Sequence, residues 1–309
     1  MSQSYISTIE TTLPTSDYVE KCVKELSKKY SFLRLSEIGR SVMGKPLWCL
    51  RFGIGKNRVF YNASHHANEY ITTNLLLKFI DRLCFAYASG GSIHRESAKE
   101  IYEYSTLALM PAVNPDGIDL VTGALTQGRY FERAREIAGN YPHFSFPSGW
   151  KANIEGVDLN LQYPAGWEQA RENKFALGVT SPAPGDFVGE SPLSAPESRA
   201  VYDYTLHFDP NLILAYHTQG EVIYWKYLGN EPFNSYKIAR IFSALSGYYV
   251  EETPYASGFA GYKDWFIDAF DRPGYTIEAG KGTNPLPLSQ FNDIYNRTLG
   301  IMTLATLVT

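Results

Sequence analysis

The chain has 309 residues and a formal net charge of −4, with 44% hydrophobic and 19% charged residues. These values are typical of a globular protein with a buried core, and they exclude a disordered or fibrous chain. Lys and Arg are scattered and form no basic stripe, so we expect no nucleic-acid partner. No stretch approaches the roughly 20 consecutive apolar residues of a membrane span, so we expect no membrane partner either.

The N-terminal residues MSQSYISTIETTLPTSDYVEKC show no basic segment followed by an apolar one, which a signal peptide would need. The cysteines Cys22, Cys49 and Cys84 are widely spaced and confined to the first third of the chain. This spacing favours neither a disulfide framework nor a thiolate metal site, so we predict buried, reduced thiols. These features predict a cytoplasmic protein and leave its oligomeric state open.

Short apolar runs and helical patterns alternate along the chain. In chain order we predict a helix at 17–29, strands at 46–52 and 58–63, a helix at 70–87, a strand at 106–110, a helix at 192–207, a strand at 211–216, a helix at 234–246, a strand-like run at 273–277 and a helix at 288–307. This alternation predicts an α/β fold, a three-layer sandwich whose mixed, mostly parallel sheet is flanked by helices. No linker divides the chain, so we predict a single catalytic domain over 1–309.

The middle section, 120–190, is rich in Gly, Pro, Tyr and Trp and shows little periodicity. Long irregular segments in a compact protein usually carry function. We therefore interpret this section as loops that form one wall of a cleft.

A candidate metal site begins where the strand 58–63 runs into the sequence SHHANEY. His66 and Glu69 are three residues apart, so a strand-to-helix turn can direct both side chains to one point. Imidazole and carboxylate suit a catalytic zinc ion, which takes three protein ligands. A short match of this kind also arises by chance in structural positions. We interpret the neighbouring His65 as a packing or supporting residue.

A third ligand is expected at another strand end, because α/β sheets bind ligands at the carboxyl ends of their strands. His217 directly follows the strand 211–216. In isolation it could equally be a buried structural histidine. The remaining histidines are weaker candidates: His94, His143 and His207.

A zinc hydrolase also needs a carboxylate that is not a ligand, to take a proton from water and deliver it to the leaving nitrogen. Glu278 closes the strand-like run 273–277 and precedes the turn Ala279-Gly280-Lys281-Gly282. A single Glu at a strand end is ordinarily just solvated, so its assignment depends on the other residues.

Together these motifs occur in a familiar order: His66-x-x-Glu69, Asn114-Pro115-Asp116-Gly117, Trp150-Lys151, Gly156-Val157-Asp158-Leu159-Asn160, His217 and Glu278. The series resembles the zinc carboxypeptidase family over almost the whole chain. The resemblance implies a mixed sheet of about eight strands and one zinc ion per chain, held by His66, Glu69 and His217. It also implies that Glu278 is the general base.

Within that family the chain looks most like the bacterial γ-D-glutamyl-L-diamino acid endopeptidases. The similarity lies in Asn62-Ala63-Ser64 and in the segments 150–153, 216–221 and 278–282. This resemblance implies a peptide substrate, a muropeptide cut between D-Glu and diaminopimelate or lysine. Conceivable contacts to the diamino acid are Lys281, Asn160 and Gln219.

The chain departs from the family at two arginines that carboxypeptidases have. Leu161 stands where the family has the Arg that binds a C-terminal carboxylate, and Asn68 replaces another Arg within the metal motif. Loss of a bidentate Arg removes a contact of roughly 1.5 to 3 kcal/mol, which argues against an ordinary C-terminal exopeptidase. Asn160 remains as a predicted substrate-binding residue.

Lys151 takes the place of the family Arg that stabilises the oxyanion, since Trp150-Lys151 corresponds to a Trp-Arg pair. Lysine keeps the charge but offers a point donor instead of a fork. Tyr255 resembles the mobile family Tyr that closes over substrate, and Tyr262 is its competitor.

These residues predict a zinc metallopeptidase that hydrolyses a peptide or isopeptide bond. One alternative is a zinc carboxypeptidase or amidohydrolase that grips its substrate differently. Another is a metal-free peptide-binding module without catalysis, against which the retention of all three candidate ligands and Glu278 argues.

Overall fold

The structure, a computed structural model, describes residues 5–308. Its main sheet contains β1 (Arg34–Arg40), β2 (Pro46–Phe52), β3 (Asn57–Ala63), β6 (Ser105–Met110), β7 (Leu212–His217), β8 (Val222–Tyr224), β9 (Tyr249–Glu251) and β10 (Gly274–Glu278). The eight strands lie in the order β1-β2-β6-β3-β7-β10-β8-β9. The four central strands, β6, β3, β7 and β10, are mutually parallel. The pairs β1–β2, β2–β6 and β10–β8 are antiparallel, and β9 pairs parallel with β8. The predicted mixed, mostly parallel sheet is confirmed.

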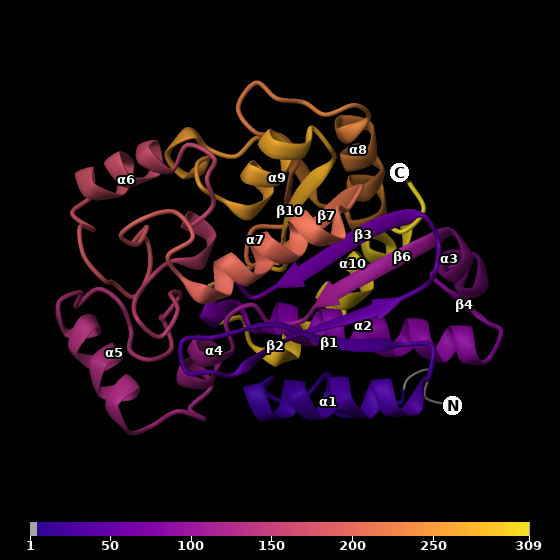
Figure 1. Ribbon diagram of the computed structural model, residues 1–309, viewed down its shortest axis with the longest axis horizontal. Helices are drawn as coiled ribbons and strands as arrows, with labels where there is room; N and C mark the ends of the chain where they lie inside the picture. Colours follow the sequence, from indigo (N-terminus) through magenta and orange to yellow (C-terminus); the bar gives the residue numbers. More distant parts are fainter. Residues whose placement is uncertain (1–4, 309) are drawn as a thin grey trace.

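Helices cover both faces of this sheet (Figure 1). They are α1 (Ser16–Lys29), α2 (Ile71–Ala88), α3 (Ala98–Tyr104), α4 (Pro115–Val121), α5 (Arg129–Gly139), α6 (Trp167–Ala176), α7 (Pro196–Phe208), α8 (Ser235–Ser246), α9 (Tyr262–Phe270) and α10 (Phe291–Leu304). A separate two-stranded hairpin consists of β4 (Ser92–Ile93) and β5 (Glu96–Ser97). Among the described residues, no helix is long and apolar enough to span a membrane.

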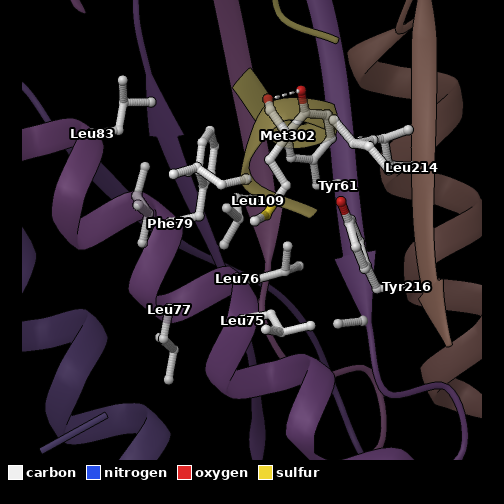
Figure 2. Close-up of a cluster of buried hydrophobic side chains, with 14 of the residues drawn as sticks. Tyr61, Leu75, Leu76, Leu77, Phe79, Leu83, Leu109, Leu214, Tyr216 and Met302 are labelled. Atoms are coloured by element: carbon white, nitrogen blue, oxygen red, sulfur yellow. Dashed lines mark hydrogen bonds between the residues drawn. The ribbon is translucent and has the colours of Figure 1, made fainter. Parts of the chain in front are cut away.

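The strand sequences explain the layers, because successive side chains point to opposite faces of a sheet. Val59 and Tyr61 of β3 join the core beneath α1, α2, α8 and α10, while Phe60 joins the core beneath α7 and α9. Figure 2 shows part of the first core, where Leu76 and Phe79 of α2 pack in the same cluster as Tyr61. The Tyr61 hydroxyl donates a 2.8 Å hydrogen bond to the carbonyl of Met302 and so satisfies its polar atom within this core.

Every predicted strand and helix is present, with small shifts of its ends. The helix predicted at 192–207 begins only at Pro196, because Ala195 is extended and Pro196 occupies the first turn. The helix predicted at 288–307 opens with a 3₁₀ turn at Leu288–Gln290 before α10. The interpretation of 120–190 as loops is wrong in part, because α5 and α6 lie within it. The strands β8 and β9 were not predicted, because three residues are too few to show a periodic pattern.

The parallel strands end on one side of the molecule. In Figure 1 the arrowhead of β3 points toward the side where α4, α5 and α6 lie, and both termini lie on the opposite side. The residues that follow β3, β7 and β10 therefore meet at one edge of the sheet, beside the section 120–190.

A buried carboxylate, Glu197, joins α7 to two segments beside this edge. One oxygen accepts a 3.0 Å hydrogen bond from the backbone N–H of Val42, and the other accepts from the Asn153 side chain at 3.2 Å. Burial, with a smaller contribution from Asp116, raises the pKa of Glu197 to about 7. The folded protein therefore keeps a proton on this group at pH values where the unfolded chain, with an ordinary pKa near 4.5, has lost it.

We expect Glu197 to make stability fall between about pH 4.5 and pH 7, because the folded state binds the extra proton throughout this range. The loss amounts to roughly 3 kcal/mol, since a tenfold change in proton affinity is about 1.4 kcal/mol. Glu197→Gln stays neutral and lacks this loss, so its free energy of unfolding relative to wild type should rise between pH 5 and pH 7.5. Urea denaturation of both proteins at the two pH values measures this difference. Parallel pH profiles would contradict the assignment.

Candidate metal centre and active site

Three predicted ligands converge at the ends of β3 and β7. His66 precedes a 3₁₀ turn, Ala67–Glu69, that leads into α2, and His217 is the last residue of β7. Nδ1 of His66 lies 2.8 Å from one carboxylate oxygen of Glu69, and Nδ1 of His217 lies 3.0 Å from the other. The two Nδ1 atoms are 3.3 Å apart. These short distances bring the three side chains into one compact donor cluster. All three side chains are buried.

This arrangement fits a zinc ion. The ligand atoms of the three residues all lie within 4.8 Å of one another. Ligands at about 2.0 to 2.2 Å in a tetrahedron around zinc are separated by roughly 3.4 Å, close to the spacing found here. A cation between the two imidazole nitrogens and the carboxylate would satisfy all three groups. A set of three protein ligands leaves the fourth position on zinc open for chemistry.

Further contacts orient the ligands. Nε2 of His66 lies 3.1 Å from Oδ1 of Asp158, so the carboxylate fixes the imidazole with Nδ1 directed into the cluster. The backbone N–H of Thr218 donates to Glu69 at 3.2 Å. Burial raises the pKa of Asp158, but His66 outweighs it and holds the pKa well below its usual range. Asp158 lies 92 residues from His66 in the sequence, and only the fold brings the two side chains together.

Glu278 is the last residue of β10 and pairs in register with His217 on β7. It is partly exposed to the cavity beside the donor cluster. Burial, followed by the charge of Glu69, raises its pKa to about 8. A carboxylate that holds a proton this readily, and that is not part of the donor cluster, has the properties of a general acid and base.

Lys151 lies on a loop that is tied to the metal centre by backbone bonds. Its carbonyl accepts a hydrogen bond from Ala67 at 2.9 Å, and its N–H donates to Pro184 at 2.7 Å. Burial lowers the pKa of its ammonium, but the carboxylates of Asp158 and Glu69 outweigh it, so the pKa lies above the ordinary value. Lys151 is therefore a cation directed into the site, as an oxyanion partner must be.

One cavity of about 250 Å³ connects these groups. It is lined by His66, His217, Glu278, Lys151 and Asp158, and also by Asn160, Leu161, Lys174, Asp186, Tyr224, Thr253, Pro254, Ser257, Gly261, Lys263, Asp264 and Thr276. Four charged residues of this lining were not predicted from the sequence, because they come from separate loops and helices and share no sequence motif: Lys174, Asp186, Lys263 and Asp264.

Asn160 and Leu161 lie in this cavity as predicted. Oδ1 of Asn160 accepts a 3.0 Å hydrogen bond from the N–H of Tyr262. Its Nδ2 group makes no hydrogen bond within the described part of the chain, so it remains available as a donor to substrate. Leu161 places an apolar side chain where the family Arg was expected.

The two candidate tyrosines have different environments. Tyr255 is 66% exposed and packs edge-on against Phe259 near the cavity rim, next to the lining residue Pro254. Tyr262 is fully buried, and its hydroxyl bonds to Thr205 at 2.9 Å. Of the two, only Tyr255 is exposed, so it stays the predicted residue that closes over substrate.

Other predicted residues lie apart from the chemistry. His65 is fully buried, bonds to the Tyr163 hydroxyl at 2.9 Å and stacks on His217, as expected of a packing residue. Lys281 forms a 2.7 Å ion pair with Glu221 and, like Gln219, does not line the cavity. Both residues therefore lie outside the cavity that the donor cluster and Glu278 share.

Comparison with known proteins assigns the class. Residues 19–299 match the zinc carboxypeptidase family. The chain is 44% identical over 279 residues to γ-D-glutamyl-L-diamino acid endopeptidase 1 of Lysinibacillus sphaericus. The alignment covers 90% of this chain and 68% of that protein. The protein belongs to the zinc carboxypeptidase family and is a zinc metallopeptidase.

Solved structures show the same fold. Bovine thrombin-activatable fibrinolysis inhibitor, in a complex with tick carboxypeptidase inhibitor, aligns with a TM-score of 0.75 at 17% identity. This alignment covers 97% of the present chain and 98% of the bovine chain. Murein-tripeptide amidase from Escherichia coli O157 aligns with a TM-score of 0.56 at 16% identity, and the alignment covers 100% of this chain and 99% of the amidase chain. At these identities the alignments describe architecture alone.

We expect His66→Ala to lose zinc, because two remaining donors cannot hold the ion against solvent. Asp158→Asn should weaken zinc binding by about ten- to a hundredfold, since it removes the carboxylate that orients His66. Zinc content after dialysis and competition with a chromophoric chelator measure both effects. His143→Ala, at an exposed histidine, is the matched control. Full zinc retention by His66→Ala would refute the ligand set.

Proposed function

We propose that this protein hydrolyses the bond between the γ-carboxyl of D-Glu and the L-centre of a diamino acid in peptidoglycan stem peptides. The relative from Lysinibacillus sphaericus carries this activity in its name, and the similarity spans 90% of the chain. The observation that carries the proposal is the convergence of the donor cluster, Glu278 and Lys151 on one cavity.

The residues around the cavity favour an endopeptidase over a carboxypeptidase. Leu161 offers no charge for a terminal carboxylate, and Asn68 is buried and donates to the Gly149 carbonyl at 3.4 Å. Neither residue supplies the bidentate contact that holds a free C-terminus. The substrate can therefore extend beyond the cleaved bond, as a stem peptide does.

The mechanism follows from the positions of these side chains. Zinc, when bound, supplies a Lewis acid that polarises the carbonyl and makes water a stronger acid. Glu278 takes the proton from the attacking water, and Lys151 balances the charge that develops on the carbonyl oxygen. Glu278 then delivers the proton to the departing amine of the diamino acid, so one carboxyl group serves both halves of the reaction.

Hydrolysis of L-Ala-γ-D-Glu-meso-diaminopimelate, with products identified by mass spectrometry, tests the bond. Release of free diaminopimelate by protein with about one zinc per chain, and its loss after chelation, are the expected results. Cleavage of the L-Ala–D-Glu bond instead would refute the proposal. A predicted cytoplasmic location would make recycled muropeptides the substrates.

We expect Glu278→Gln to keep its zinc while kcat falls by about a hundredfold or more, because the amide cannot accept or deliver the proton. Metal analysis and steady-state kinetics on the same preparation separate the two effects. Glu155→Gln, a change at an exposed glutamate outside the cavity, is the matched control and should keep full activity. A fully active Glu278→Gln enzyme would remove Glu278 from the mechanism.

A further inference from the structure

The loops that follow β7 and β10 meet behind the metal centre. The first loop, residues 218–221, follows the ligand His217, and the second loop, residues 279–284, follows the base Glu278. The backbone N–H of Ala279 donates to the carbonyl of His217 at 2.8 Å. The positions of the ligand and the base relative to each other therefore depend on how these two loops are joined.

Asn284 and Thr218 form a reciprocal pair between the loops. The Thr218 hydroxyl donates to Oδ1 of Asn284 at 2.7 Å, and Nδ2 of Asn284 donates to the carbonyl of Thr218 at 2.9 Å. An amide can fill both roles, because it carries a donor and an acceptor in one plane. Thr218 is only 4% exposed, so water competes little for these bonds. The pair therefore fixes the orientation of Thr218 against the second loop.

Thr218 passes this restraint on to two metal ligands. It directly follows His217, and its own backbone N–H donates to Oε2 of Glu69 at 3.2 Å. The same oxygen lies 3.0 Å from Nδ1 of His217. Because Thr218 is covalently joined to one ligand and hydrogen-bonded to the other, a rotation of this residue would displace both.

We propose that Asn284 is a positioning residue for the metal centre. Acting through Thr218, it holds His217 and Glu69 in the geometry that zinc requires and fixes them relative to Glu278. Neither Asn284 nor Thr218 lines the cavity, so the pair acts on the ligands and not on the substrate. The inference rests on the zinc centre and is independent of which peptide the enzyme cleaves.

Glu221, in the first loop, is the competing candidate for this role. Its carboxylate forms ion pairs with Lys281, at 2.7 Å, and with Arg297 of α10. Burial raises the pKa of Glu221, but these two cations outweigh it and hold the pKa below its ordinary value. The Lys281 side chain is 65% exposed, and ion pairs to exposed cations contribute little. Glu221 thus ties the first loop to α10 and not to the metal ligands.

Zinc affinity of the apo-protein, measured by competition with a chromophoric chelator, tests the inference without any substrate. We expect Asn284→Leu and Thr218→Val each to weaken zinc binding by about tenfold or more, because each breaks the reciprocal pair. Thr218→Ser keeps the hydroxyl and should bind zinc as the wild type does. The double variant with Thr218→Val and Asn284→Leu should bind no more weakly than Asn284→Leu alone, since both changes remove the same interaction.

Kinetics of the zinc-saturated protein test the link to the base. On L-Ala-γ-D-Glu-meso-diaminopimelate we expect Asn284→Leu to lower kcat by about tenfold and to leave KM nearly unchanged. The ligands shift relative to Glu278 in this variant, whereas the cavity lining is intact. Asn292→Leu, at an exposed asparagine of α10, is the matched control and should change neither kcat nor zinc affinity.

Melting temperatures of the apo-proteins separate a positioning role from a purely structural one. A lower melting temperature of Asn284→Leu with wild-type zinc affinity would overturn the inference. Additive losses of zinc affinity in the double variant would do the same, because the two residues would then act separately. If Asn284→Leu does not fold, the comparison of Thr218→Val with Thr218→Ser decides the question. Absence of cleavage by the wild-type enzyme would refute the proposed function, whereas the zinc measurements would still decide this inference.

Discussion

The parallel pairing of β3, β7 and β10 is the constraint on which the site depends. Ala63 pairs with Tyr216, and Glu278 pairs with His217, so all three strands end at the same level of the sheet. A shift of one residue in a strand would turn its side chains to the opposite face and separate the ligands from the base. The apolar cores on both faces fix this register, and the register in turn fixes the positions of the ligands and the base relative to one another.

Charge balance is the second determinant of the site. Glu69, Asp158 and Glu278 bring three carboxylates to the site, and the positive groups beside them are Lys151 and His66. Burial lowers the pKa of His66, but Glu69 outweighs it and raises this pKa to about 9. Burial raises the pKa of Glu278, and the charge of Glu69 raises it further. The carboxylate of the donor cluster thus also adjusts the proton affinity of the base.

No arginine of the described residues lines the cavity. Leu161 gives up the carboxylate clamp, and the charges that line the cavity now occur as pairs of opposite sign. Paired charges present both a donor and an acceptor, whereas an arginine clamp presents donors alone. The wall of the cavity therefore offers both donors and acceptors beside the catalytic group.

The sequence by itself determined the central strands, the long helices and the metal ligands. Buried strands read as apolar runs. His66 and Glu69 closely follow β3, His217 ends β7, and the order of these motifs along the chain resembles the zinc carboxypeptidase family. Only the tertiary structure decided the helices within 120–190, the contact of Asp158 with His66, and the pairing of Lys263 with Asp264 inside the cavity. These features depend on which distant segments pack together, and no periodicity within a segment records its neighbours in space.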